Sequence, residues 1–409
     1  MKPSPPSGPT ATRRKARRSD ERQYRFLTYV FGGGFKVQEA DTVTPVRVAS
    51  VRGQLRFWWR ACNPGKCTTV EELRQREGEI WGTTSQASRV EITVLAQPRP
   101  PQKVQVYEYN PRQRLVPCKG MWEIAYGAFP LQPSKNEQQN GAKARKLFDY
   151  QGSPFTLRFV YPEELREDIE AALWAWETFG GLGGRTRRGF GAIMRAASQG
   201  MSAEAGLARY SEHPRISGVP SLHRARFGAA PGTVGDALQA WKAGLGLLKR
   251  LRQEADHGRN PPQDSSKPAG RSRWPEPDAI RHLTGDAAPL HRIPVVRVER
   301  FPRAVFGMPV IFHFSTNGDP NMDPQLLPID SERLASPVII RPVPEGNRFR
   351  TAALVLSSDI PEVKLVADKK TYMVDWRLDP AQARAIPALV RNGTAFTDPL
   401  ELFLSELKK

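Results

Sequence analysis

Cysteine is scarce in this chain, which has three among its 409 residues: Cys62, Cys67 and Cys118. Three thiols cannot build a disulfide framework, so the class of small disulfide-stapled secreted domains is excluded. No other His or Cys stands near them at the spacing of zinc ligands, although a structural zinc site is the lesser alternative. We therefore expect free thiols in a cytoplasmic protein that holds no metal and no other cofactor.

Long apolar runs are also missing. No stretch reaches the roughly 18 apolar residues of a membrane-spanning helix, so we expect no membrane as a partner. Residues 1–22 contain basic side chains but no apolar segment of the kind that secretory signals carry. Because they are rich in Pro, Ser and Arg and have almost no bulky apolar residues, we expect a disordered basic tail. The same composition predicts a disordered insertion at residues 256–273.

Acidic residues are too few to balance the basic ones. The chain has 61 Lys and Arg against 42 Asp and Glu, a formal net charge of +19, and 44 of the basic residues are Arg. Such an excess repels itself unless a polyanion neutralises it, and the planar guanidinium matches phosphate geometry. The composition therefore favours a nucleic-acid partner, with a charge that only serves solubility as the alternative.

The chain is long enough for two or three domains, and its apolar patterns alternate between helix and strand periods. This pattern predicts an α+β fold with structured regions at residues 23–200 and 201–409. Residues 199–214 are interpreted as a connector. The strongest predicted elements are strands at 24–31, 89–96 and 154–161, helices at 50–62, 162–179, 233–252 and 398–409, and a hairpin over 336–358.

The densest functional signal is the segment 50–62, SVRGQLRFWWRAC. Ser50 is a suitable N-cap, and an apolar stripe that includes Trp58 and Trp59 is expected to pack into a core. Arg52, Arg56 and Arg60 stand four apart, so they form one row on another face of the helix, with no acidic residue between them. The row predicts contacts with RNA phosphates; a solvated basic face, or pairing with distant carboxylates, is the alternative. Lys36 and Arg47, just before the helix, add charge to the same region.

The second signal is the segment 180–191, GGLGGRTRRGFG. Its glycines permit close backbone approach and positive φ, so that amide groups could point at an anion, and its three arginines supply charge. Neither the dinucleotide fingerprint nor the Walker A pattern is satisfied. The segment is interpreted as a helix-to-strand loop that clamps a sugar-phosphate chain, against the alternative of a flexible turn with solvated arginines. The residues of this loop that we expect to contact RNA are Gly181, Gly183, Gly184, Arg185, Arg187 and Arg188.

These two segments, in this order, resemble the RAMP (repeat-associated mysterious protein) superfamily of CRISPR systems, whose domains carry a late glycine-rich loop. The block TPVRVASVRGQLRFWWRA, with EIWG and ASRVEITV after it, is similar to the first, end-capping subunit of type III-B (Cmr) effector complexes. Three further segments resemble parts of the second half of that subunit: GRSRWPEPDAIR, FGMP and RLASPVIIRP. The resemblance covers most of residues 24–342.

The resemblance implies two tandem ferredoxin-like (RRM-like) domains and no catalytic centre. It implies a place at the 3′ end of the guide RNA, with guide RNA, single-stranded target RNA and other RAMP subunits as partners. By position, it assigns phosphate contacts to Lys36, Arg47, Arg52, Arg56, Arg60 and the loop from Gly181 to Arg188.

Two alternatives to this function stay open. Some RAMP proteins are metal-independent ribonucleases that process guide RNA, so a catalytic His must be considered. All six histidines lie in the second half of the chain, and His213 and His223 are the two to test. Asp41, Glu77 and Glu79 are not spaced as a magnesium-binding cluster. The other alternative is a general single-strand RNA-binding protein outside CRISPR systems.

Overall fold

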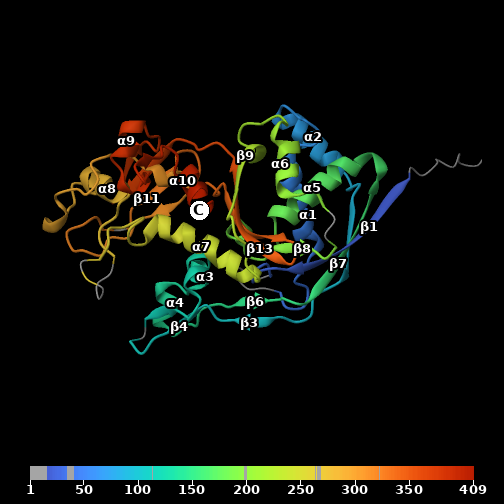
Figure 1. Ribbon diagram of the computed structural model, residues 1–409, viewed down its shortest axis with the longest axis horizontal. Helices are drawn as coiled ribbons and strands as arrows, with labels where there is room; N and C mark the ends of the chain where they lie inside the picture. Colours follow the sequence, from blue (N-terminus) through green and yellow to red (C-terminus); the bar gives the residue numbers. More distant parts are fainter. Residues whose placement is uncertain are drawn as a thin grey trace, which may run out of the picture.

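The computed structural model describes residues 16–34, 41–112, 114–197, 200–262, 264, 269–321 and 323–409. It is a mixed α+β structure with several small sheets (Figure 1), as the alternating periodicity predicts. Two sheets with their helices, one from each half of the chain, pack against each other around the glycine-rich segment. No helix in the described ranges is both long and apolar enough to cross a membrane.

The first half is built on a four-stranded sheet in the order β2-β7-β1-β8, in which all neighbours are antiparallel. Two helices connect β1 to β2, and one connects β7 to β8, so the chain runs β-α-β-β-α-β with the third strand between the first two. The elements are β1 (Arg17–Phe26), α1 (Val48–Cys62), α2 (Val70–Trp81), β2 (Glu91–Ala96), β7 (Pro154–Pro162), the 3-10 turn η2 (Glu163–Leu165), α5 (Arg166–Phe179), η3 (Thr186–Arg188) and β8 (Ile193–Arg195).

Helices α1 and α5 cover one face of this sheet because their apolar stripes match it. Every second residue of β7 is buried, as the period-2 pattern predicts, and α5 buries its predicted stripe from Ile169 to Phe179. On α1, Trp58 and Trp59 are 2% and 0% exposed, which confirms that they belong to the core. Helix α1 begins at Val48, with Arg47 at the N-cap position, so the prediction of Ser50 as N-cap is wrong.

A long excursion between β2 and β7 leaves this sheet and reaches the second half of the molecule. Its helix α3 packs against α7 of the second half (Figure 1). Ile124, Ala125 and Ala128 of this excursion are buried in one cluster with Leu245 and Leu248 of α7. Its elements are β3 (Gln102–Val104), β4 (Tyr107–Tyr109), β5 (Leu115–Pro117), α3 (Trp122–Gly127), η1 (Phe129–Leu131), α4 (Lys135–Gln139) and β6 (Leu147–Asp149).

The second half is built on a three-stranded antiparallel sheet in the order β12-β13-β9. The hairpin β12–β13 is the predicted one, and the apolar stripe of α7 packs on both of its strands. Chain order and strand order repeat the arrangement of the first three strands of the first sheet. The elements are α6 (Ala203–Ser211), β9 (Ser221–Ala229), α7 (Ala237–Gln253), β12 (Val338–Glu345), β13 (Arg348–Ser357) and α10 (Pro399–Leu407).

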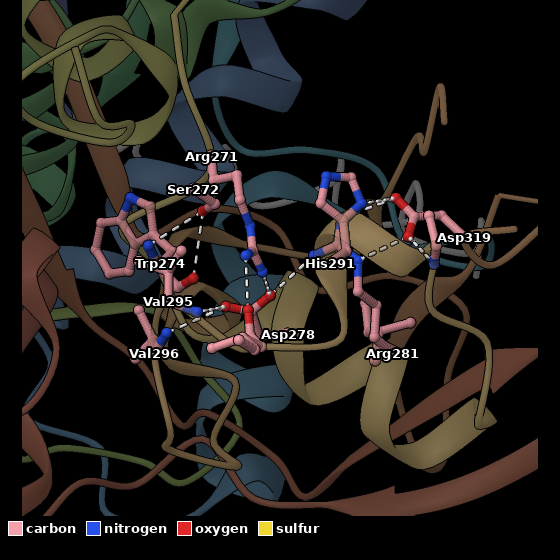
Figure 2. A network of polar contacts seen from close by, with 12 residues as sticks. Arg271, Ser272, Trp274, Asp278, Arg281, His291, Val295, Val296 and Asp319 are labelled. Atoms are coloured by element: carbon pink, nitrogen blue, oxygen red, sulfur yellow. Dashed lines mark hydrogen bonds and ion pairs between the residues drawn. The ribbon is translucent and has the colours of Figure 1, made fainter. Parts of the chain in front are cut away.

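A smaller sheet, in the order β10-β11-β14-β15, forms the far end of the second half. Figure 2 shows the polar network that fixes α8 beside it. Asp319, 3% exposed, accepts two hydrogen bonds from Arg281 at 3.0 Å and one from His291 at 2.6 Å. The remaining elements are α8 (Glu276–Thr284), η4 (Pro289–His291), η5 (Pro302–Phe306), β10 (Val310–Ile311), β11 (Gln325–Pro328), β14 (Val363–Ala367), β15 (Lys370–Val374), α9 (Pro380–Arg384), η6 (Pro387–Leu389), β16 (Val390–Arg391) and β17 (Thr394–Ala395).

Three segments predicted to lack structure differ from that expectation where the structure describes them. Residues 17–22 of the predicted tail belong to β1, because Arg22 pairs there with Asp20, Glu170 and Glu177; residues 1–15 lie outside the described ranges. The predicted connector contains helix α6, which Ser202 caps. In the predicted insertion, Arg259 bridges to Ser272 through backbone pairing, while residues 263 and 265–268 are not described.

The two halves meet where the loop of residues 180–191, called the glycine loop from here on, lies against β12. Gly189 has φ +78°, and a Cβ built on it would lie 2.5 Å from the carbonyl oxygen of Ile340. From the other side, the 2% exposed Arg341 donates hydrogen bonds to the carbonyls of Gly180 at 3.0 Å and Ile193 at 2.7 Å. Burial without a carboxylate lowers the pKa of Arg341 to about 9.

Replacing Gly191 with alanine tests whether this close packing holds the fold together. Gly191 has φ +60°, and a Cβ there would lie 1.9 Å from the carbonyl oxygen of Leu182. We expect Gly191→Ala to lower the free energy of unfolding by about 3 kcal/mol or more, because backbone must move and an L residue is strained at that φ. Chemical denaturation followed by circular dichroism measures the change.

The matched control is Gly53→Ala in α1, where an added Cβ meets nothing within 4 Å. Alanine is the better helix former, so this variant should be more stable by about 0.5–1 kcal/mol. Equal stabilities for the two variants would show that the glycine loop tolerates a side chain at residue 191 and that its close internal packing does not stabilise the fold.

Candidate nucleic-acid interface

The predicted arginine row lies on one side of α1, and all three of its side chains are half-buried. Glu77 of α2 contacts two of them: its Oε1 accepts from Arg56 Nε at 2.6 Å and from Arg60 Nη1 at 2.5 Å. For Arg56 and Arg60 the structure therefore shows the alternative that the sequence left open, pairing with a distant carboxylate. The reason is geometric, because α2 folds back beside α1 and carries an acid that is distant in sequence.

Glu77 does not neutralise the row. One carboxylate, 7% exposed, faces two guanidinium groups, and the third arginine of the row forms no ion pair within the described part of the chain. This third residue is Arg52, whose Nε is buried without a hydrogen-bond partner. With three positive charges and one negative charge, the row keeps a surplus that suits a bridging anion.

Of the two other predicted cations before α1, the structure describes one. Arg47 donates to the carbonyl of Gly33, and a Cβ on Gly33 would lie 3.2 Å from the Cα of Gly183. Arg47 is thus attached to the strip of backbone on which the glycine loop rests. Lys36 lies outside the described residues.

Backbone amides of the glycine loop donate hydrogen bonds to neighbouring carbonyls and hold the loop in place. Gly184 N donates to the carbonyl of Phe31 at 2.6 Å, Leu182 N to Gly191 at 2.9 Å, and Gly191 N to Tyr29 at 2.8 Å. The expectation that loop amides are free to point at an anion is therefore wrong for these groups, because the neighbouring backbone uses them. Gly181, Gly183 and Gly184 serve packing: a Cβ on any of them would lie 2.6–3.1 Å from another atom of the protein.

The loop's side chains, unlike its amides, leave positive charge uncompensated. Arg185, Arg187 and Arg188 are half-buried, and none of them pairs with a carboxylate among the residues that the structure describes. Arg185 lies over the ring of Phe129 at 5.0 Å, and Arg187 lies over Phe57 at 5.4 Å. Arg188 Nη1 is buried with no hydrogen-bond partner.

Burial and like charge act together on Arg188. Burial, with smaller contributions from the charges of Arg252, Arg185 and Arg187, lowers the pKa of its guanidinium to about 10, and Tyr126 opposes this shift. A buried cation among cations costs free energy unless an anion offsets it. The glycine loop is therefore a site where a phosphate would relieve repulsion that the free protein contains.

The row and the glycine loop adjoin each other. Arg187 reaches Phe57 in the middle of α1, and a Cβ on Gly180 would lie 2.7 Å from Nε1 of Trp58. The structure thus brings the two predicted segments, separated by more than a hundred residues of chain, to one region of the first half. Sequence reasoning missed two residues of this region, Glu77 and Arg341; neither belongs to a motif, and only the fold places them there.

The two candidate catalytic histidines make backbone contacts instead of facing the arginines. His213 Nδ1 lies 3.0 Å from the carbonyl oxygens of Cys62 and Asn63, and His223 Nδ1 lies 2.8 Å from the carbonyl oxygen of His213. Because carbonyls accept, Nδ1 of each ring carries the proton. This arrangement fixes α6 and β9 against the end of α1.

Other chemistry is sparse in the described ranges. No three His, Cys, Asp or Glu side chains there are grouped so that they could hold a metal ion. Cys62 and Cys67 are buried, Cys118 is half-buried, and all three are free thiols. Burial raises the pKa of each thiol, so none of them is activated as a nucleophile.

Arginine-to-alanine changes in the row test whether it contacts phosphates. For single-stranded RNA, each lost phosphate contact should reduce the slope of log affinity against log salt by about 0.7. We expect a reduction of about 0.7 for Arg52→Ala and of about 2 for the variant in which Arg52, Arg56 and Arg60 are all alanine. Fluorescence anisotropy of a labelled RNA over a salt series measures the slope.

Arg377→Ala is the control, because it removes one exposed arginine that pairs with Asp375 at 3.3 Å. This variant should keep the wild-type slope. If the triple variant also kept it, the RNA would lie away from α1.

Comparisons with known proteins are consistent with this description. No curated protein matches the chain. The chain is similar to Cmr1 from Pyrococcus furiosus in its apo crystal structure, with 16% identity, 95% of this chain and 96% of that chain covered, and a TM-score of 0.49. It is also similar to a chain of the type III-B Cmr-beta complex bound to cognate target RNA, with 9% identity, 87% and 96% covered, and a TM-score of 0.41.

Both likenesses have low identity and low TM-scores, so they carry no statement about function. The comparison with protein-family models uses the sequence and does not depend on structural similarity. Residues 23–194 match the model of the RAMP superfamily, and this segment contains both the arginine row and the glycine loop. The match confirms the predicted RAMP resemblance for this part of the chain.

Proposed function

We propose that the chain is a non-catalytic RNA-binding subunit of a type III-B CRISPR (Cmr) effector complex, an RNA-guided antiviral assembly of the cytoplasm. It would lie at the 3′ end of the guide RNA, beside other RAMP subunits, and contact the backbones of the guide and the single-stranded target RNA. The observation that carries the proposal is the glycine loop, where three half-buried arginines have no carboxylate partner among the residues that the structure describes. The RAMP match and the RGQLRFWWRA block support the same assignment.

The mechanism is recognition of the sugar-phosphate backbone. Guanidinium groups bind phosphate oxygens without reading sequence, and base pairing between guide and target supplies the specificity. Arg52, with its free Nε, and Arg188, with its free Nη1, have donors that the protein itself does not use. Glu77 holds Arg56 and Arg60 side by side, so the row is oriented before RNA arrives.

The proposed architecture is two tandem ferredoxin-like domains. The first sheet has the β-α-β-β-α-β order and the strand arrangement 2-3-1-4 of that fold, and the second sheet has the arrangement 2-3-1. We place the boundary near residue 200, with the first domain starting at β1 and the second ending at α10. The sheet containing β11 and β14 is then an addition to the second domain.

A guide-processing endoribonuclease is the alternative, and turnover separates it from the proposed function. Incubated with repeat RNA and EDTA, the purified protein should leave the RNA intact on a denaturing gel. It should still bind that RNA, with a salt slope of roughly −3.5 if about five phosphates are neutralised. We expect this result because both candidate histidines are engaged with backbone carbonyls.

Discrete cleavage that disappears in His213→Ala or His223→Ala would overturn the proposal in favour of the nuclease. Salt-sensitive binding to RNA together with failure to join the other effector subunits in a pull-down would leave a general RNA-binding protein instead.

A further inference from the structure

The excursion of the first half places aromatic side chains in solvent next to the glycine loop. Trp122 of α3 is 52% exposed and Phe129 of η1 is 60% exposed, whereas most aromatic residues of this chain are buried. Between them Tyr126 is half-buried. Trp122 and Tyr126 stand four apart in α3, so their rings share one side of this helix, and Phe129 follows in the next turn, η1. We call these three residues the aromatic strip.

Cations from two other elements lie over the ends of the strip. The guanidinium of Arg185, from the glycine loop, is 5.0 Å from the centre of the Phe129 ring. The ammonium of Lys249, from α7, is 6.0 Å from the centre of the Trp122 ring. Lys249 also pairs with Glu254 at 2.8 Å, so the surplus charge of this surface comes from the loop arginines, which have no such partner among the described residues.

The strip is rigid because its other side is packed. Tyr107 donates to the carbonyl of Ala125 at 2.6 Å, and a Cβ on Gly127 would lie 2.9 Å from the ring of Phe190 in the glycine loop. Lys242 of α7 donates to the carbonyl of Gly120 at 3.1 Å, just before α3. The α3–η1 segment is therefore held in place by the same loop and helix that supply the cations, and Figure 1 shows α3 beside α7.

Exposed rings with cations beside them are what single-stranded nucleic acid requires. Bases stack on aromatic faces whatever their sequence, and nearby arginines hold the backbone. About half of each of these two aromatic residues is exposed to water, which costs the free protein hydrophobic burial. The cations over the two outer rings, Arg185 and Lys249, suit the phosphates of a nucleic acid.

We propose that the aromatic strip is a base-stacking platform for unpaired nucleotides of the RNA whose phosphates the glycine loop binds. This inference rests on the proposed function and adds to it a contact with bases. Trp122 and Phe129 each stack on one base, Tyr126 lies between them, and Arg185 serves both the ring and the adjacent phosphate. The RNA therefore runs from the glycine loop along α3 towards α7.

Abasic RNA gives a direct test. We compare a single-stranded uridine oligonucleotide with the same oligonucleotide carrying consecutive abasic sites, using the wild type and the variant with Trp122→Ala and Phe129→Ala. Each stacked base contributes about 1–3 kcal/mol, so the double variant should bind the normal RNA at least roughly tenfold more weakly. Its salt slope should equal the wild-type slope, because no phosphate contact is removed.

The abasic RNA should abolish the difference between the two proteins. Trp122→Phe with Phe129→Tyr should restore binding, since these rings also stack. Leu290→Ala, at another exposed apolar residue, should change nothing. Because the altered side chains are exposed, thermal unfolding should be unaffected in all variants.

The outcomes separate the two proposals. If the double variant bound both RNAs as the wild type does, with the salt slope intact, the platform would be refuted while the RNA-binding function stood. If the wild type showed no salt-sensitive binding to either RNA, the proposed function would fail and the platform with it. Retained RNA affinity with loss of co-purification with other effector subunits would make the strip a protein-docking surface and overturn the inference.

Discussion

Close approach of backbone to backbone at the glycine loop is the constraint on which the remaining structure depends. A side chain at residue 189 would collide with the carbonyl oxygen of Ile340, so only glycine lets β12 of the second half approach the loop there; a side chain at residue 191 would collide with the carbonyl oxygen of Leu182 within the loop. Once the loop is seated, its arginines point in directions that the backbone determines. The positions of Arg185, Arg187 and Arg188 therefore follow from packing, and any ligand meets cations that are already placed.

The pKa values of two arginines, Arg22 and Arg188, shift in opposite directions. Burial opposes the charge of Arg22, but Glu177 and Glu170 raise its pKa, and this arginine is a closed structural pair. Arg188 is half-buried, and burial together with the charges of neighbouring arginines lowers its pKa. If stability alone mattered, both guanidinium groups would be expected to have carboxylate partners. The contrast is consistent with the proposal that the glycine loop binds an anion from outside the protein.

The sequence predicted the elements better than the contacts between them. Periodicity located α5, α7 and the β12–β13 hairpin because each buries a regular stripe, and Trp58 and Trp59 followed from the same pattern. It did not reveal Glu77 beside the arginine row, since that contact depends on how α2 folds back on α1. Nor did it show that the loop amides are occupied, or that Trp122 and Phe129 are exposed, because aromatic residues at helical spacing usually indicate a core.

The ion pairs of Glu77 also affect how strongly the arginine row can attract an anion. The carboxylate of Glu77 is a counterion that Arg56 and Arg60 share. It reduces the repulsion between their guanidinium groups and weakens their attraction for other anions. An arriving phosphate must compete with it, so the gain in attraction at α1 is smaller than three bare charges would give. If the row binds RNA as proposed, this competition weakens the attraction and would let a bound strand dissociate more readily.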